Sequence, residues 1–133
     1  MVDFGNILAG LQTLLSLESI IALIAGTVGG MVIGALPGFS AAMGVSLLIP
    51  ITYGMGPVAA LSMLVAMYTS AIYGGSITAI LCHTPGTPAS AATAIEGYQM
   101  TLQGRAGKAL GVSCFSSFCG GLLSCISLYF FAP

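Results

Sequence analysis

The sequence has very little charge. Its 133 residues include two Lys or Arg, three Asp or Glu and one His, and residues 19–95 contain no Asp, Glu, Lys or Arg. A soluble domain covers its solvated surface with charged side chains, so this composition excludes a water-soluble globular protein. A net charge of −1 also excludes a nucleic-acid-binding protein, which needs a basic face. We therefore expect the surface to face lipid.

Two common signatures are also missing. Residues 1–19 contain no Lys or Arg, so they lack the positive n-region of a secretory signal, and the first span is expected to direct membrane insertion. The cysteines follow neither a zinc-binding nor a redox spacing, and we predict that they are small packing residues; they are Cys82, Cys114, Cys119 and Cys125. No resident cofactor or metal is predicted.

What the sequence does contain is apolar. Hydrophobic residues make up 57% of the chain and the mean hydropathy is +1.08. A spanning helix needs roughly 20 apolar residues, so the chain holds enough for about four. The predicted fold class is an all-α polytopic membrane protein, with a single membrane domain over residues 1–133. Because the chain is small for a transporter and stops after an apolar run, we expect an N-terminal portion of a longer polypeptide.

The order of apolar runs and helix breakers predicts the elements. They are an interfacial helix at 1–18, a first span at 19–36, a broken or half helix and turn at 37–56, a span at 57–83, a Pro-Gly break with a short helix at 84–100, a polar loop at 101–108, and a last span at 109–131. Ser40 is expected to cap the third segment and Pro50 to interrupt it. Arg105 and Lys108 favour a cytoplasmic loop by the positive-inside rule, whereas the side of the N-terminus stays open.

Small residues recur every four positions along the first span. The stripe consists of Gly26, Gly30, Gly34 and Gly38, extended by Ala22 and Ala42. Such a bare helix face lets a second helix approach closely. Two interpretations stay open, which are packing within this chain and a dimer interface between two chains.

The two Pro-Gly breaks are the sharper feature. Broken backbone in hydrocarbon leaves N–H and C=O groups unpaired, so it persists where protein buries it or where it lines a cavity; a packing kink is the alternative. A helix restarting at Ser40, or at Thr87 with Pro88 as its first residue, would offer free amides, including those of Ala89 and Ser90, to a carboxylate. Nearby carbonyls could hold Na⁺. The predicted substrate-binding residues are Pro37, Gly38, Ser40, Thr84, Pro85, Gly86, Thr87 and Ser90.

Three side chains near the second break are predicted to contact a coupling ion, either Na⁺ or H⁺; they are His83, Ser76 and Thr78. Ionisable groups at membrane depth are usually functional, which favours His83 as a proton-coupling or substrate-contacting residue. The alternative is a neutral imidazole bonded to a carbonyl freed beside Pro85. Glu96 is expected to mark the end of the short helix near the interface.

At these residues the chain resembles the large membrane subunit of the tripartite tricarboxylate transporter family, the TctA family. The resemblance covers about residues 26–123. Its blocks are residues 34–38 (GALPG), 48–50 (LIP), 73–77 (YGGSI), 84–90 (TPGTPAS), 96–98 (EGY) and 103–111 (QGRAGKALG). The sequence departs from the family pattern at His83, where Asn is expected, at Glu96, where Asp is expected, and at Gly56, where an acidic residue is common.

The resemblance implies a secondary-active permease of the bacterial inner membrane that takes up tricarboxylates or related carboxylates. It implies two partners, a small membrane subunit and a periplasmic substrate-binding protein. Family members have about a dozen spans in two related halves, so the chain would supply roughly the first third of an inverted-repeat transporter. By itself it is not expected to transport.

Two other functions are weighed against transport by the permease. A small oligomeric channel or accessory subunit would use the glycine stripe as its oligomer interface and the breaks as its pore lining. An intramembrane hydrolase would use Ser76 with His83, but a nucleophile, base and oxyanion donors need to converge, and the chain offers no second His. The sequence therefore predicts no enzyme.

Overall fold

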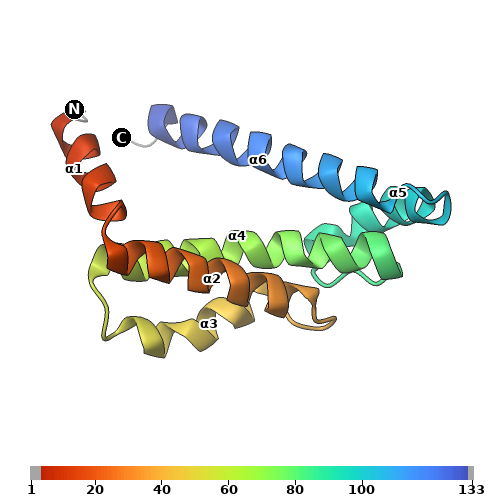
Figure 1. Ribbon diagram of the computed structural model, residues 1–133, viewed down its shortest axis with the longest axis horizontal. Coiled ribbons are helices and arrows are strands. Elements are labelled where there is room, and N and C mark those ends of the chain that lie inside the picture. The colour runs from red at the N-terminus through yellow and green to blue at the C-terminus, as the bar shows by residue number, and fades with distance from the viewer. Residues whose placement is uncertain (1–3, 132–133) are drawn as a thin grey trace.

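The computed structural model describes residues 4–131, and these form helices joined by short turns (Figure 1). The helices are α1 (Phe4–Leu14), α2 (Leu17–Ala35), α3 (Ala41–Thr52), α4 (Pro57–Cys82), the 3₁₀ turn η1 (Pro88–Ser90), α5 (Ala91–Leu102) and α6 (Ala106–Phe131). Within the described residues, α2, α4 and α6 are long and apolar enough to cross a membrane. The chain is therefore an all-α membrane protein, as the sequence predicts.

The remaining apolar sequence, which contributes to the estimate of about four spans, lies in two shorter helices. α3 and α5 have 12 residues each, about 18 Å of helix, which is too short to cross roughly 30 Å of hydrocarbon. They are the broken segments of the prediction. α3 runs back alongside α2 and α4, and α5 lies beside the C-terminal end of α4 (Figure 1).

α2 and α4 pack in parallel through the glycine stripe. Ala22, Gly26, Gly30 and Gly34 are all buried. A Cβ atom added to Gly26 would collide with the Met63 carbonyl, at Gly30 it would lie 2.5 Å from the Met67 carbonyl oxygen, and at Gly34 it would lie 2.6 Å from the Ala71 carbonyl carbon. The residue numbers of the contacting positions increase together along α2 and α4, so the two helices run in the same direction. The stripe therefore packs within the chain.

The stripe ends at Gly34. Gly38 lies beyond the end of α2, where an added Cβ would meet nothing within 4 Å, and Ala42 is exposed. α3 packs by a different glycine, since a Cβ on Gly44 would lie 2.7 Å from Cε of Met67. The closely packed pair of α2 and α4 thus forms the rigid centre of the fold, and α3 packs against this pair.

α6 runs back antiparallel to α4 and packs only lightly against it (Figure 1). Of its residues, only Ala109 is buried. The prediction that the cysteines are packing residues is accordingly wrong for Cys82, Cys114 and Cys125, which are exposed, while Cys119 is half-buried. Cys82 is the last residue of α4, and the others lie on α6, which leaves most of its surface uncovered. Small apolar side chains suit lipid as well as they suit protein.

Several predicted boundaries differ from the structure. α3 continues through Pro50 to Thr52, so the prediction that Pro50 interrupts it is wrong; Pro50 lies in the last turn, and the helix ends two residues later. α5 continues to Leu102 and α6 begins at Ala106, so the polar loop is shorter than 101–108. Lys108 therefore lies in the first turn of α6. Glu96 lies in the middle of α5, and the expectation that it marks a helix end is wrong.

A single carboxylate joins the starts of α2 and α4. Glu18, in the first turn of α2, accepts a hydrogen bond from the backbone N–H of Gly56 at 3.0 Å. Gly56 is the N-cap of α4 and has no side chain with which to cap it. Glu18 therefore supplies from a neighbouring helix the negative charge that a helix N-terminus favours.

We expect Glu18→Gln to lower the free energy of unfolding by about 1 kcal/mol, because the amide oxygen keeps the hydrogen bond but loses the charge at two helix N-termini. Thermal unfolding in detergent, followed by circular dichroism, measures this change. Gln12→Ala on the exposed surface of α1 is the control. A stability equal to that of the unmodified protein would contradict the bridging role of Glu18.

Candidate functional site

The first break is a tight reversal between α2 and α3. α2 ends at Ala35, and the N–H of Phe39 donates to the Leu36 carbonyl at 3.3 Å, closing a turn around Pro37 and Gly38. Gly38 has φ = 94°, a conformation that side chains with a Cβ rarely adopt. Ser40 then caps α3, as predicted, because its hydroxyl accepts from the N–H of Met43 at 3.2 Å.

The second break folds back onto α4. His83 caps the C-terminus of α4 in the left-handed region, with φ = 56°. The chain then returns by about two turns, and the N–H of Gly86 donates to the Gly75 carbonyl at 3.4 Å. Thr87 is the N-cap of η1 and Pro88 its first residue, as predicted. The Ser90 hydroxyl accepts from the Thr87 N–H at 3.3 Å and donates to the Thr87 carbonyl at 2.7 Å.

Glycines allow this fold-back. A Cβ on Gly75 would lie 2.9 Å from the Thr87 nitrogen, and a Cβ on Gly86 would lie 2.9 Å from Gly75 Cα and would collide with the Gly34 carbonyl. The second break therefore rests on α2 and α4 together, at the level where α2 ends. This contact places it beside the first break.

The two breaks line one cavity of about 340 Å³. Its lining residues are Gly38, Phe39, Ser40, Pro85, Gly86, Thr87 and Pro88. Segments that lie more than 40 residues apart in sequence thus meet at a single open site. No Lys, Arg, Asp or Glu is among the residues that line it. Its polarity comes from backbone groups and two hydroxyls.

The start of α3 supplies amides to this region. Within the described residues, the N–H groups of Ala41 and Ala42 have no hydrogen-bond partner, as expected for the first turn of a helix. At η1 the prediction of two free amides is wrong in part, because the N–H of Ser90 donates to the Thr87 carbonyl at 3.0 Å. A tight 3₁₀ turn satisfies that donor internally.

The predicted substrate-binding residues fall into two groups. Gly38, Ser40, Pro85, Gly86 and Thr87 line the cavity. The others lie nearby without lining it: Pro37 and Thr84 are exposed, and Ser90 is buried in its hydrogen bonds to Thr87. Phe39 and Pro88 also line the cavity, although Pro88 was predicted only as the first residue of a helix and Phe39 was not predicted to have a role.

His83 contacts α5 and not a carbonyl beside Pro85. Its Nδ1 lies 3.1 Å from the Ala94 carbonyl oxygen, and its ring lies 4.7 Å from the ring of Tyr98 at a tilt of 37°. The imidazole thus ties the C-terminal cap of α4 to α5. Among the residues lining the cavity between the breaks, His83 is absent.

The three side chains predicted to contact a coupling ion point to different partners. The Thr78 hydroxyl donates to the Gly75 carbonyl at 3.2 Å, and the Ser76 hydroxyl donates to the Ile72 carbonyl at 3.4 Å. His83 binds Ala94, as described above. Ser76 and His83 share neither a hydrogen bond nor a lining surface in the described residues, so the arrangement offers a hydrolase no nucleophile and base in contact.

Comparison with known proteins gives one family. The model of the "Tripartite tricarboxylate transporter TctA family" matches residues 20–133. A protein of Agrobacterium vitis, described as "Uncharacterized 52.8 kDa protein in TAR-I ttuC' 3'region", is 41% identical over 134 residues. That match covers 100% of this chain and 27% of the relative, so the chain spans about a quarter of the relative's length. No solved structure matches.

Proposed function

Because the chain belongs to the tripartite tricarboxylate transporter TctA family, we propose that it forms part of the large permease subunit of a secondary-active transporter for tricarboxylates or related carboxylates. The family match covers most of the chain, and three helices of spanning length support a membrane protein. The proposal includes a small membrane subunit and a periplasmic substrate-binding protein as partners, and the bacterial inner membrane as the location.

The observation that carries this proposal is the cavity lined by both breaks. Unwound backbone in a membrane segment is stable where it lines a water-filled site, and transporters bind substrates between such interrupted helices. The free amides of Ala41 and Ala42 at the start of α3 carry the positive end of the helix dipole. Neither alanine lines the cavity, but both follow Ser40, which does, so a carboxylate that reaches Ser40 would lie near these amides although no basic side chain lines the cavity.

Uptake by this carrier would be coupled to Na⁺ or H⁺. The glycine-packed pair of α2 and α4 would serve as the rigid body, because its backbones are in direct contact. The second break rests on this pair, and the first break and α3 would move relative to both during alternating access. Binding between the breaks would then change which side of the membrane the site faces.

Ala41→Pro tests the amide directly. Ala41 is the first residue of α3, where proline is favoured, and Ser40 before it already has the extended conformation that a following proline requires, with φ = −97° and ψ = 156°. The substitution removes one N–H and leaves the helix start intact. We expect the KM for citrate uptake by the assembled transporter to rise by about tenfold, because a charge-assisted hydrogen bond is lost.

Ala41→Val is the matched control, since it adds similar bulk at this buried position and retains the N–H. It is expected to change the KM much less than proline does. Equal effects of the two variants would mean that the bulk matters and the amide does not, and would contradict amide recognition of the carboxylate. Uptake that stays saturable and unchanged in both would place the substrate elsewhere.

A further inference from the structure

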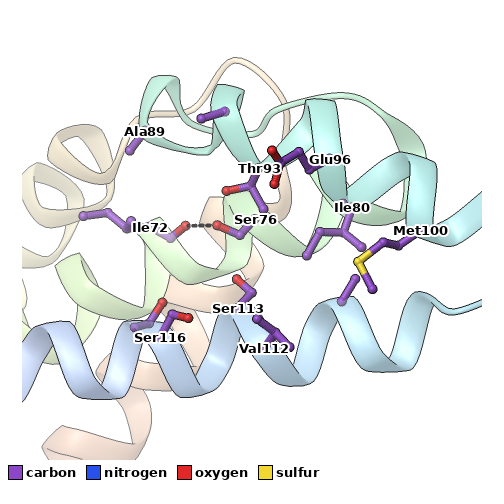
Figure 2. Close-up of a pocket in the computed structure, with 14 residues that line it drawn as sticks. Ile72, Ser76, Ile80, Ala89, Thr93, Glu96, Met100, Val112, Ser113 and Ser116 are labelled. Carbon is purple, nitrogen blue, oxygen red and sulfur yellow. Dashed lines mark hydrogen bonds between the residues drawn. The ribbon is translucent and has the colours of Figure 1, made fainter.

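A second cavity, of about 500 Å³, lies between α4, α5 and α6 (Figure 2). It is separate from the cavity between the breaks and has a different polarity. Besides apolar residues it is lined by one carboxylate and five hydroxyls; these belong to Glu96, Thr93, Ser76, Ser113, Ser116 and Ser117. No Lys, Arg or His is among the lining residues. The cavity therefore presents oxygen ligands and a single negative charge.

These oxygens come from three helices. In Figure 2 the carboxylate of Glu96 lies next to Thr93 on the same side of α5, and the Ser113 side chain points from α6 toward α4. Ser76 of α4 lies between these two groups in the view, with its hydroxyl directed at the Ile72 carbonyl. A ligand bound here would join α5, α4 and α6, although α6 otherwise packs only lightly.

The charge of Glu96 has no counterion in the cavity. Of the two cations of the chain, Arg105 lies in the turn between α5 and α6, and Lys108 lies in the first turn of α6. Glu96 is six residues, about 9 Å of helix, before the end of α5. Glu96 is exposed at the open side of the cavity, and a carboxylate at membrane depth is costly unless a cation or a set of hydrogen bonds compensates its charge. One monovalent cation would neutralise it fully.

We propose that this cavity binds a sodium ion, held by the carboxylate of Glu96 and by hydroxyls of Thr93, Ser76 and Ser113. Hard cations prefer oxygen ligands, and several neutral oxygens around one carboxylate match the charge of Na⁺. A proton would need the carboxylate alone, whereas a sodium ion would also use the hydroxyl oxygens of three helices. As a coupling site, this sodium site rests on the proposed transport function.

The two cavities share a wall. Pro88 lines the cavity between the breaks, and Ala89, the next residue of η1, lines the sodium cavity. The Thr87 and Ser90 hydroxyls brace this wall through their mutual hydrogen bonds, and both residues are buried. Sodium that draws α5 toward α4 and α6 would therefore shift η1 and the carboxylate site on its other side. Coupling between the two ligands follows from this shared element.

The test measures sodium binding without transport. The protein is purified in detergent, and its unfolding temperature is followed by circular dichroism as NaCl replaces choline chloride at constant ionic strength. We expect a saturable rise with sodium, because a ligand that binds only the folded state stabilises it. Glu96→Gln should abolish the rise, and Ser113→Ala should weaken the apparent sodium affinity by about fivefold.

Ser124→Ala is the matched control, because Ser124 is an exposed serine of α6 that does not line the cavity. If Glu96→Gln does not fold, Glu96→Asp replaces it and should retain a weaker sodium response. The inference is overturned if sodium has no saturable effect, if Glu96→Gln keeps the full response, or if only a lower pH raises the unfolding temperature. Sodium binding without carboxylate uptake would instead contradict the proposed function alone.

Discussion

Replacing Gly34 by alanine is expected to lower the free energy of unfolding by about 3 kcal/mol, one of the largest stability effects of any small substitution in this chain. The added Cβ would lie 2.6 Å from the carbonyl carbon and 2.7 Å from the Cα of Ala71. These are backbone atoms of α4, so no side chain can rotate away to make room. α2 and α4 would have to separate over several turns.

Gly29→Ala is the matched control for this prediction. It lies on the same helix, and its added Cβ would have only the Met67 sulfur near it, at 3.9 Å, which is ordinary van der Waals contact. Alanine is favoured over glycine in a helix, so we expect an unchanged stability or a gain of about 0.5 kcal/mol. Thermal unfolding in detergent compares the two variants. Equal stabilities would show that the stripe does not set the distance between the helices.

The glycine stripe could be read from the sequence because its four-residue repeat is local information. Its partner surface could not, since α4 mixes small residues with larger ones on the contacting face: Met67, Ser70, Ala71 and Gly74 are all buried there. Met67 reaches over toward α3 while its backbone contacts Gly30. Which face of α4 meets the stripe depends on tertiary packing, which no pattern along α4 reveals.

The helix caps at the breaks were predictable for the same reason. A Ser or Thr directly before an apolar run or before a proline predicts a helix start to within a few residues. Ser40 and Thr87 are the N-caps of α3 and η1 in the structure. The meeting of the two breaks was not predictable. It requires α4 to continue beyond the end of α2 and the chain after α4 to return to Gly75. The distance by which α4 extends past α2 follows from the packing of Gly34 against Ala71, which the sequence does not show.

The structure also gives a reason for the residue type at position 83. A helix C-cap in the left-handed region favours glycine or asparagine, and the asparagine that the family resemblance leads one to expect there fits this conformation. His83 adopts it at φ = 56° and adds a ring that contacts the Ala94 carbonyl and Tyr98. The departure from the pattern is therefore accommodated by packing against α5. Being ionisable made His83 a candidate functional residue from sequence, but its contacts with α5 depend on the fold.

Gly86→Ala is expected to reduce citrate uptake by the assembled transporter at least about tenfold, since binding groups must be held within about 0.5 Å of the productive geometry. The methyl group would lie 2.9 Å from Gly75 Cα and 3.2 Å from the Thr78 hydroxyl, and it would collide with the Gly34 carbonyl. The loop has to lift away from α2 and α4. Pro85, Thr87 and Pro88 would then move relative to Ser40, and the two breaks would no longer line one cavity.

Gly111→Ala is the control for this last prediction, because a Cβ at Gly111 of α6 would meet nothing within 4 Å, and uptake should be unchanged. Membrane abundance of each variant, measured by immunoblot, separates lost transport from lost protein. Gly86 lies in the loop after α4, so the loop can move away from an added methyl group while α2 and α4 stay packed. The stability of Gly86→Ala should therefore fall less than that of Gly34→Ala. Full uptake in Gly86→Ala would mean that carboxylate recognition does not depend on the two breaks being held together.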